Sequence, residues 1–343
     1  MVQSKPILID AVHITMGGGK SLLDYLCEKL VARQVQFVLL RDIRNRTTAS
    51  SGALSEITID GEMLRRKYYA KHRDDFSSVL CFANIPPAIK LTCPVYTYFH
   101  NINLLQIPDD FSFKRKVITL MKRFYIALHS RNTNAWIVQT TNTEEHLRKV
   151  LPCTGKDIFR LPFYRSLSCA GVEMSNPTRD DYVLIGDYTG TRGHDELLKA
   201  WKILNQKGFD KTLHLTVAVD NPFSHCIDAV RAEGVNVVNH GVIPFEDVID
   251  LYHRSKATIY PSKNESLGLG IVEAIEAGCD VIGANLPYIY SVCEPSVVFD
   301  SITPDEIVSA VIKYEDGCRQ QSSVKINDNV NDLINCILGC QEN

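Results

Sequence analysis

Several features that would assign this chain to a common protein class are missing from it. It has no run of 18 apolar residues, so it predicts no transmembrane helix. Its 11 cysteines include no CxxC pair, and their scatter predicts buried, reduced thiols, not a disulfide framework or a zinc site. The opening residues run directly into a strand pattern without the apolar segment of a signal peptide. These absences predict a cytoplasmic protein.

Three ligand-binding motifs are also absent. There is no Asp-x-Asp metal motif, so we expect neither a metal nor a cofactor. Neither glycine cluster completes G-x-G-x-x-G, since Glu273 stands where the third glycine after Gly268 and Gly270 is needed, and a dehydrogenase is therefore not expected. The segment 16–21 reads MGGGKS but lacks the first glycine of a P-loop, because Ile14 takes its place. This argues against an ATPase.

What the chain does have is a length of 343 residues and a hydrophobic content of 45%, enough for two domains with their own cores. Short apolar runs recur with helical patterns between most of them. These runs are 7–9, 37–40, 79–82, 95–99 and 135–138 in the first half and 182–185, 213–219, 235–238, 257–260, 280–284 and 297–299 in the second. Strands that alternate with helices predict parallel sheets with helices on both faces. We therefore expect an α/β protein with two Rossmann-like, doubly wound domains.

The most informative segment is 261–278, which reads PSKNESLGLGIVEAIEAG. It follows one strand-like run and precedes another. Its apolar part, Leu269 to Ala277, predicts a short helix that ends at Gly278. In such a unit the loop and the helix N-terminus lie at the carboxyl edge of a parallel sheet, where ligands bind.

Two acids in this segment suit a sugar nucleotide. Gly268 and Gly270 let a ligand approach the backbone, and N–H groups at the helix start favour phosphate. Glu273, one turn into the helix, can accept hydrogen bonds from a vicinal diol such as a ribose. Glu265 lies in the loop, near the group that the phosphate carries. A plain strand–helix–strand unit with two surface glutamates is the alternative.

At these residues the chain resembles the retaining GT-B glycosyltransferases of the family 4 type, also called glycosyl transferases group 1. Their hallmark is two glutamates eight positions apart within PS-x-x-E-G-x-G-x-x-x-x-E-A-x-A-x-G. The matching positions are Pro261, Ser262, Glu265, Gly268, Glu273, Ala274, Ala277 and Gly278. Ser266 and Leu267 replace the usual Gly-Phe, and Glu276 stands where a small residue is common. The resemblance implies a GT-B fold, in which two Rossmann-like domains face a central cleft.

The resemblance also implies roles for these residues. Glu265 would contact the donor sugar and Glu273 the ribose. The backbone from Leu267 through Gly268 to Leu269 would contact the sugar or the diphosphate. The reaction would retain the anomeric configuration, with the leaving diphosphate taking the acceptor proton.

Two features of the first half gain expected roles in the same way. Family members have a glycine-rich first loop near the donor diphosphate and the acceptor, and Gly17, Gly18 and Gly19 match it. His100 ends a strand-like run, where the family has a histidine that holds the donor sugar near the acceptor. A structural glycine turn and a satisfied loop histidine are the alternatives.

The loop 186–193 opens the first helix of the second domain. The family has an arginine after its first glycine and a lysine before its last, and both bind diphosphate. Here Asp187 replaces the arginine and Arg192 the lysine, and a guanidinium can clamp phosphate through its planar fork. Lys263 is the candidate replacement for the missing cation. A solvated arginine at a helix start is the alternative for Arg192.

We expect an N-terminal acceptor domain at 1–165 and a C-terminal donor domain at 166–316. The polar stretch 174–179 has no periodicity and reads as their connector. In GT-B proteins a C-terminal helix often crosses back to the first domain. Residues 317–343, which are helical in pattern at 330–340, are predicted to pack there.

The net charge of −3 conceals two halves of opposite sign. Residues 1–165 carry 24 Lys and Arg against 14 Asp and Glu, whereas residues 166–343 carry 13 against 26. The first half should therefore face something anionic. No aromatic-basic interleaving or DNA-binding motif supports nucleic acid as that partner.

A basic amphipathic helix is predicted over 113–131. Arg115 and Lys122 lie on its polar face, and Lys116 and Arg123 flank that face. The helix either packs its apolar stripe on the core or is attracted to an anionic membrane surface, where each basic residue contributes roughly 1 kcal/mol.

The resemblance and the charge together predict a function. We expect a retaining transfer of a hexose from a UDP- or GDP-sugar to a lipid-linked or oligosaccharide acceptor. The setting would be O-antigen or capsule synthesis, with the protein peripheral on the inner face of the cytoplasmic membrane. The alternatives are a sugar-nucleotide epimerase of the same fold and a non-catalytic nucleotide-sugar-binding protein.

Overall fold

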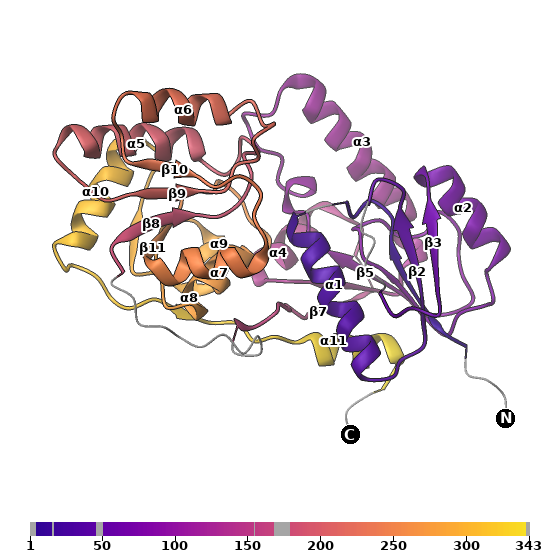
Figure 1. The fold of residues 1–343 in the computed structure, drawn as a ribbon. Helices are drawn as coiled ribbons and strands as arrows, with labels where there is room; N and C mark the ends of the chain where they lie inside the picture. The colour runs from indigo at the N-terminus through magenta and orange to yellow at the C-terminus, as the bar shows by residue number, and fades with distance from the viewer. Residues whose placement is uncertain (1–4, 16, 46–50, 154, 168–178, 341–343) are drawn as a thin grey trace. The chain divides into compact units, whose positions relative to one another are not determined.

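The computed structural model describes residues 5–15, 17–45, 51–153, 155–167 and 179–340. Met16 and most of the predicted connector lie outside the described residues. The chain divides into two compact units (Figure 1). Unit 1 comprises Met1–Arg165 and Asn327–Asn343, and unit 2 comprises Ser166–Ile326.

Unit 1 is built on a seven-stranded parallel sheet in the order β3-β2-β1-β4-β5-β6-β7. Its strands are β1 (Ile7–Ala11), β2 (Phe37–Asp42), β3 (Ser55–Ile59), β4 (Val79–Cys81), β5 (Val95–Phe99), β6 (Ala135–Val138) and β7 (Asp157–Arg160). Its helices are α1 (Gly17–Ala32), α2 (Gly61–Lys71), α3 (Phe113–His129), α4 (Thr141–Val150) and α11 (Val330–Leu338), with the one-turn helices η1 (Ile102–Leu104) and η2 (Ser130–Asn132).

Unit 2 is built on a six-stranded parallel sheet in the order β10-β9-β8-β11-β12-β14. Its strands are β8 (Asp181–Leu184), β9 (Leu213–Leu215), β10 (Val237–Asn239), β11 (Ser255–Tyr260), β12 (Asp280–Ala284) and β14 (Val297–Phe299). Its helices are α5 (His194–Gln206), α6 (Ser224–Ala232), α7 (Phe245–Arg254), α8 (Leu269–Glu276), α9 (Pro287–Tyr290) and α10 (Pro304–Glu315). A small antiparallel pair, β13 (Cys293–Glu294) with β15 (Ser323–Val324), lies beside it.

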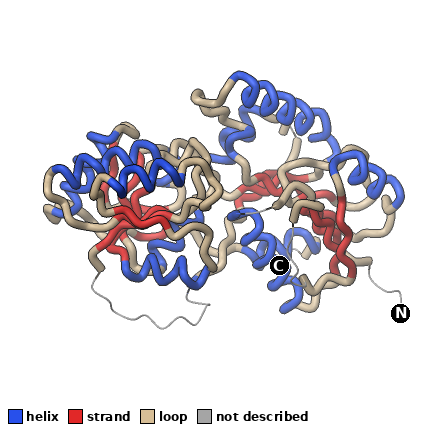
Figure 2. The backbone as a smooth tube through the Cα atoms, turned by 45° about the horizontal axis from the view of Figure 1, so that its top comes forward, coloured by secondary structure: helices blue, strands red, loops and turns tan. Residues whose placement is uncertain are grey.

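In each unit the strand order reverses once, between β1 and β4 in unit 1 and between β8 and β11 in unit 2. Helices cover both faces of each sheet (Figure 2). This confirms the prediction of two doubly wound parallel-sheet domains. Loops that follow neighbouring strands on either side of a reversal diverge, and they leave a crevice at the carboxyl edge where ligands bind.

Within the two parallel sheets, the strands that the apolar runs did not predict are β3 and β7. Both lie at the edges of the unit 1 sheet, where most of their residues are exposed or half-buried. An edge strand carries fewer apolar residues, so its sequence has little to distinguish it from a loop.

The return of the chain to unit 1 starts later than predicted. Residues 317–326 belong to unit 2, not unit 1. They are held there because β15 pairs with β13, and because Ser322 accepts a hydrogen bond from the Val281 amide of β12 at 2.8 Å. Only the segment from Asn327 onward belongs to unit 1, where α11 buries Val330, Leu333, Ile334 and Ile337.

Helix α3 does not pack its apolar stripe on the core, so that interpretation is wrong. Only Thr119 and Ile126 are buried along its whole length. The exposed apolar side chains are Phe113 (84%), Phe124 (72%), Met121 (66%), Leu128 (51%), Leu120 (50%), Ile118 (43%) and Val117 (38%). The helix therefore presents its apolar stripe outward.

Candidate active site

The loop between β11 and α8 has the geometry that its glycines predict. Gly268 adopts the left-handed φ of 70° and caps the start of α8. A Cβ on Gly270 would lie 3.1 Å from the Tyr252 hydroxyl, which donates to the Gly270 carbonyl oxygen, also at 3.1 Å. The Leu267 side chain is buried, whereas Leu269 is half-buried.

This loop lies at the strand-order reversal of unit 2. It follows β11, and the neighbouring loop 186–193 follows β8. The Lys263 amide donates to the Thr191 carbonyl oxygen at 2.9 Å, which ties the two loops together. A Cβ on Gly193 would lie 2.3 Å from the Pro261 carbonyl oxygen, so this approach requires glycine. The Lys263 side chain is exposed beside this junction.

Glu265 is held by hydroxyl donors from its own segment. Its Oε1 accepts from Ser262 Oγ at 2.9 Å and from Tyr260 Oη at 3.4 Å. The Tyr288 hydroxyl, on α9, donates to the Ser262 carbonyl oxygen at 2.8 Å and so holds the loop against that helix. The carboxylate is half-buried, with a defined orientation and remaining acceptor capacity.

Arg192 lies in the same electrostatic neighbourhood. Its Nη1 donates to the Ile185 carbonyl oxygen at 3.2 Å, and a Cβ on Gly186 would fall 1.8 Å from that nitrogen. Burial lowers the pKa of Arg192, but the electrostatic influence of Tyr260, Glu265, Tyr252 and Asp187 together raises it by more, so the net shift is upward. The guanidinium is thus fixed as a cation beside the catalytic candidate Glu265.

Glu273 has a raised pKa of about 7. Burial is the main cause, the nearby charge of Glu276 adds to it, and Arg192 opposes both. Arg192 therefore interacts electrostatically with both glutamates. Glu276 itself is engaged by the Leu167 amide at 2.7 Å and the Ser166 hydroxyl at 3.0 Å.

This shift predicts a pH-dependent stability. The pKa of Glu273 is about 7 in the folded chain, against a usual value of 4.5. Its contribution to the stability of the folded chain is therefore complete below pH 4.5 and is lost as the pH rises through about 7. We expect Glu273→Gln to gain stability relative to the wild type over this window, by on the order of 1–3 kcal/mol. Urea unfolding from pH 4 to pH 8 measures this difference. Glu246→Gln, an exposed acid on α7, is the control and should show no trend. A Glu273→Gln difference that stays constant with pH would contradict the assignment.

Asp187, which replaces the arginine expected from the resemblance, stabilises loops at the carboxyl edge of the unit 2 sheet. Its Oδ1 accepts from the Tyr188 amide at 2.9 Å, the Asn221 side-chain amide at 3.0 Å and the Ala218 amide at 3.1 Å. It therefore fastens the loop after β8 to the loop after β9. A carboxylate engaged in this way repels a diphosphate, unlike the arginine that the resemblance led us to expect at this position.

The predicted glycines and His100 lie at the carboxyl edge of the unit 1 sheet, after β1 and β5. The His100 amide donates to Asn84 Oδ1 at 2.7 Å, and burial lowers the pKa of the imidazole to about 4. Gly17 starts α1 with a φ of 67°, and a Cβ on Gly19 would lie 3.6 Å from His100 Nε2. The glycine segment and His100 are thus brought together. Lys20 pairs with Asp24 instead of facing this edge.

The basic residues of α3 separate into different environments. Arg123 donates to the carbonyl oxygens of Leu104 at 2.8 Å and Leu105 at 2.9 Å, so it holds η1, and its side chain is only half-buried. Arg115 lies 3.6 Å above the ring of Phe111. Lys116 is half-buried and Lys122 is exposed.

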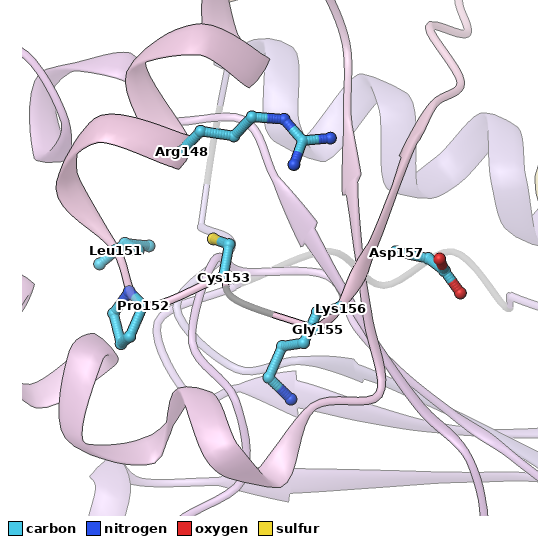
Figure 3. A pocket seen from close by; sticks show the side chains of 7 residues that line it. All are labelled: Arg148, Leu151, Pro152, Cys153, Gly155, Lys156 and Asp157. Carbon is cyan, nitrogen blue, oxygen red and sulfur yellow. The ribbon is translucent and has the colours of Figure 1, made fainter.

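A hollow beside α4 is not a candidate for the reaction. It is lined by Arg148, Leu151, Pro152, Cys153, Gly155, Lys156 and Asp157 (Figure 3). It lies at the amino end of β7, the edge opposite to the one where α/β sheets bind ligands. Arg148 is paired with Glu144 at 2.8 Å, and Lys156 donates to the Thr133 carbonyl oxygen.

Sequence reasoning missed the hydroxyl and aromatic groups that orient these residues. Tyr260 ends β11 and Ser262 precedes Glu265 by three positions, so both were visible beside the motif. Tyr252 and Tyr288 come from α7 and α9, and no local pattern points to them. Their contacts exist only after the strands assemble.

Comparison with known proteins gives two kinds of match. Residues 172–329 match the family model described as glycosyl transferases group 1. Among solved structures, sucrose-phosphate synthase from Thermosynechococcus elongatus has 16% identity and a TM-score of 0.71, over 91% of this chain and 90% of that one. WaaG, a glycosyltransferase involved in lipopolysaccharide biosynthesis, has 13% identity and a TM-score of 0.71, over 97% and 100%.

A third structure carries a nucleotide. TarM from S. aureus, solved in complex with UDP, has 16% identity and a TM-score of 0.57, over 81% of this chain and 54% of that one. Comparison with curated protein sequences gives no match. At these identities the structures establish the fold alone. The chain has the GT-B fold of glycosyltransferases, and its residues 172–329 match the glycosyl transferases group 1 family.

Proposed function

We propose that this chain is a retaining glycosyltransferase that moves a hexose from a UDP- or GDP-sugar to a lipid-linked saccharide. The observation that carries the proposal is the grouping of Glu265, Glu273 and Arg192 at the strand-order reversal of unit 2. A family model for glycosyltransferases matches the same region. The fixed cation and two carboxylates suit an activated sugar whose diphosphate, ribose and hexose need different partners.

Each group has a part in the proposed reaction. Arg192 and the amides at the start of α8 would bind the diphosphate and stabilise the charge it gains as the glycosidic bond breaks. Glu273 would accept hydrogen bonds from the ribose, and Glu265 would orient the hexose and support its developing positive charge. The leaving diphosphate would take the acceptor proton. No divalent metal is needed in this scheme, because Arg192 and the amides carry out charge stabilisation.

The acceptor is proposed from two observations. WaaG acts in lipopolysaccharide biosynthesis, which favours a lipid-linked saccharide here. Helix α3 presents an outward apolar stripe and contains no Asp or Glu, while Lys114 and Lys116 lie beside that stripe. An apolar stripe bordered by lysines matches an anionic bilayer surface, into which such a helix inserts its apolar side chains.

We therefore propose peripheral attachment to an anionic membrane, on the inner face of the cytoplasmic membrane. Within the described residues no helix is long and apolar enough to cross a bilayer. Arg65, a basic residue of α2, is buried and pairs with Asp10 at 2.6 Å. The attachment is accordingly proposed for α3 and its lysines, not for α2.

A donor screen tests the proposed function. UDP- or GDP-hexoses should raise the melting temperature, because a ligand that binds only the folded chain stabilises it. The stabilising donor should then label a lipid-linked saccharide with retained configuration, as read by NMR. Isomerisation of the donor without an acceptor would indicate an epimerase instead. Donor binding with no transfer to any lipid-linked acceptor would indicate a binding protein, and absence of binding by all of these donors would overturn the proposal.

A further inference from the structure

The last turn of α8 carries an acid that the donor chemistry does not use. Glu276 ends this helix one turn after Glu273, at a position where the resemblance led us to expect a small residue. Both of its carboxylate oxygens are engaged: Oε1 accepts from the Ser166 hydroxyl at 3.0 Å and Oε2 from the Leu167 amide at 2.7 Å. Two hydrogen bonds to one half-buried carboxylate fix its position. They also fix the helical turn that carries it.

Ser166 and Leu167 are the first two residues of unit 2. The boundary with unit 1 falls directly before them, and Arg165 on its other side pairs with Glu28 of α1 at 2.5 Å. Two consecutive residues, Arg165 and Ser166, are therefore held by different units. The chain enters unit 2 directly on Glu276.

The Leu167 side chain adds an apolar contact to these hydrogen bonds. It is 6% exposed and belongs to the core cluster that contains Ala274 of α8 and Tyr252 of α7. Tyr252 in turn donates to the Gly270 carbonyl oxygen near the start of α8, at 3.1 Å. The entry segment 166–167 is thus packed against the donor-site helix as well as hydrogen-bonded to it.

A second residue near the unit boundary reaches the same end of α8. Arg179 Nη2 donates to the Ala277 carbonyl oxygen at 2.6 Å, and its Nη1 donates to the Ser255 carbonyl oxygen at 3.4 Å. Gly278, with a left-handed φ of 84°, leaves room for the guanidinium, because a Cβ there would lie 2.9 Å from Arg179 Nη2. The carboxyl end of α8 is therefore held by residues that precede and residues that follow 168–178 in the sequence.

Glu273 lies three positions before this held end, and residues three apart on a helix are neighbours. After burial, the charge of Glu276 is the next cause of the raised pKa of Glu273, and Arg192 opposes both. The phenols of Tyr252 on α7 and Tyr260 on β11 also interact electrostatically with Glu273. Burial raises the pKa of each phenol above its usual value, so both stay neutral near pH 7.

The other strands against α8 add no competing charge. β12 contributes Asp280, whose two oxygens accept from the Ser322 amide at 2.9 Å and the Tyr314 hydroxyl at 3.0 Å. β15 contributes no titratable side chain. Within the described part of the chain, the charged side chains that act on Glu273 are thus Glu276 and Arg192.

We infer that Glu276 is a positioning residue for the donor site, which ties α8 and its Glu273 to the segment by which the chain enters unit 2. The inference rests on the proposed function, in which Glu273 binds the donor ribose. Glu276 holds the helix through Ser166 and Leu167, and it sets a fixed like charge one turn from Glu273. A change at the unit boundary would therefore reach the ribose-binding carboxylate along a single helix.

Hydrogen–deuterium exchange of the full chain, read on peptides of α8, tests the contact without any donor. Ser166→Ala should speed the exchange of α8 amides about fivefold, the effect of one hydrogen bond, and Glu276→Ala should speed it more. Glu276→Gln keeps an oxygen acceptor for the Leu167 amide and should exchange more slowly than Glu276→Ala. Ser309→Ala, which removes an exposed serine from α10 in the same unit, should leave α8 unchanged.

A pH profile distinguishes positioning of Glu273 from support of the fold alone. The stability gained on Glu273→Gln, measured by urea unfolding from pH 4 to pH 8, is determined again in a Glu276→Gln chain. Because the like charge is gone, the pKa of Glu273 should fall, so the gain should be smaller and should level off at a lower pH. In a Glu246→Gln chain the gain should keep its wild-type profile. Cooperative urea transitions also show that the variants are folded.

Equal α8 exchange in Glu276→Ala and the wild type would overturn the inference, and so would an unshifted pH profile in Glu276→Gln. Calorimetric titration with UDP-glucose and GDP-mannose then examines the donor. If the wild type binds either one, Glu276→Ala should bind it at least fivefold more weakly, and equal affinities would also overturn the inference. The expected exchange and pH results in a chain that binds neither donor would overturn only the proposed function.

Discussion

Replacing Glu265 by Gln should lower kcat by roughly 10²–10³-fold, with a smaller change in the donor KM. The amide keeps the shape and can still accept from Ser262 Oγ, which lies 2.9 Å from the carboxylate in the wild type. What is lost is a negative charge beside the sugar as its anomeric carbon becomes electron-poor. Removal of one preorganised electrostatic contact typically costs about this factor. Initial rates of hexose transfer at saturating acceptor measure it.

Glu246→Gln is the matched control for Glu265, because it makes the same chemical change on an exposed position of α7 in the same unit. It should keep the wild-type kcat. Equal turnover by Glu265→Gln and the wild type would show that Glu265 is not part of the reaction. A shared loss of turnover in both variants would indicate a general effect of lost charge on unit 2.

Replacing Leu120 and Phe124 together by Ser should weaken binding to anionic vesicles by roughly a hundredfold. Both side chains are at least half exposed on α3, so the change leaves the core intact. Burial of a Leu or Phe side chain is worth about 1.5–3 kcal/mol, and partial insertion of two such side chains into a bilayer gives this factor. Co-sedimentation with phosphatidylglycerol vesicles measures it. Transfer to a soluble saccharide acceptor should be unaffected.

The control for α3 is Ile312→Ser with Leu338→Ser, two half-exposed apolar residues on α10 and α11. Their loss should not change vesicle binding. Neutral vesicles and high salt should weaken the wild type, because the lysine contribution is electrostatic and screened. A wild-type chain that fails to bind anionic vesicles at low salt would refute the membrane proposal.

The sequence predicted the architecture well and the packing of α3 badly. Both results follow from the kind of information that the spacing of apolar residues in a sequence contains. Alternating apolar runs define strands and helices locally, and a parallel sheet with helices on both faces is a common way to bury them all. The periodicity of α3 shows that it has an apolar stripe, but periodicity does not say whether protein or solvent lies against that stripe. Here Thr119 and Ile126 face the protein instead.

The residues of the candidate site likewise fall into those that the sequence identified and those that it did not. The motif around Glu265 and Glu273 was visible because its residues are close in sequence and their spacing is that of a loop and one helical turn. Tyr252 and Tyr288, which support this motif, come from α7 and α9, so no spacing links them to it. The role of Arg65 was equally hidden, because its burial against Asp10 depends on the packing of α2 over β1.

The sequence by itself predicted two α/β domains and an acidic, glycine-bearing loop at the edge of one sheet. These features depend on local patterns and on residues that are near neighbours in the chain. Only the tertiary structure decided that Arg192 interacts electrostatically with both acids, that residues 317–326 stay with unit 2, and that α3 turns its apolar side outward. The reason is that burial and charge depend on atoms distant in the chain. Those atoms become neighbours only when the sheets assemble.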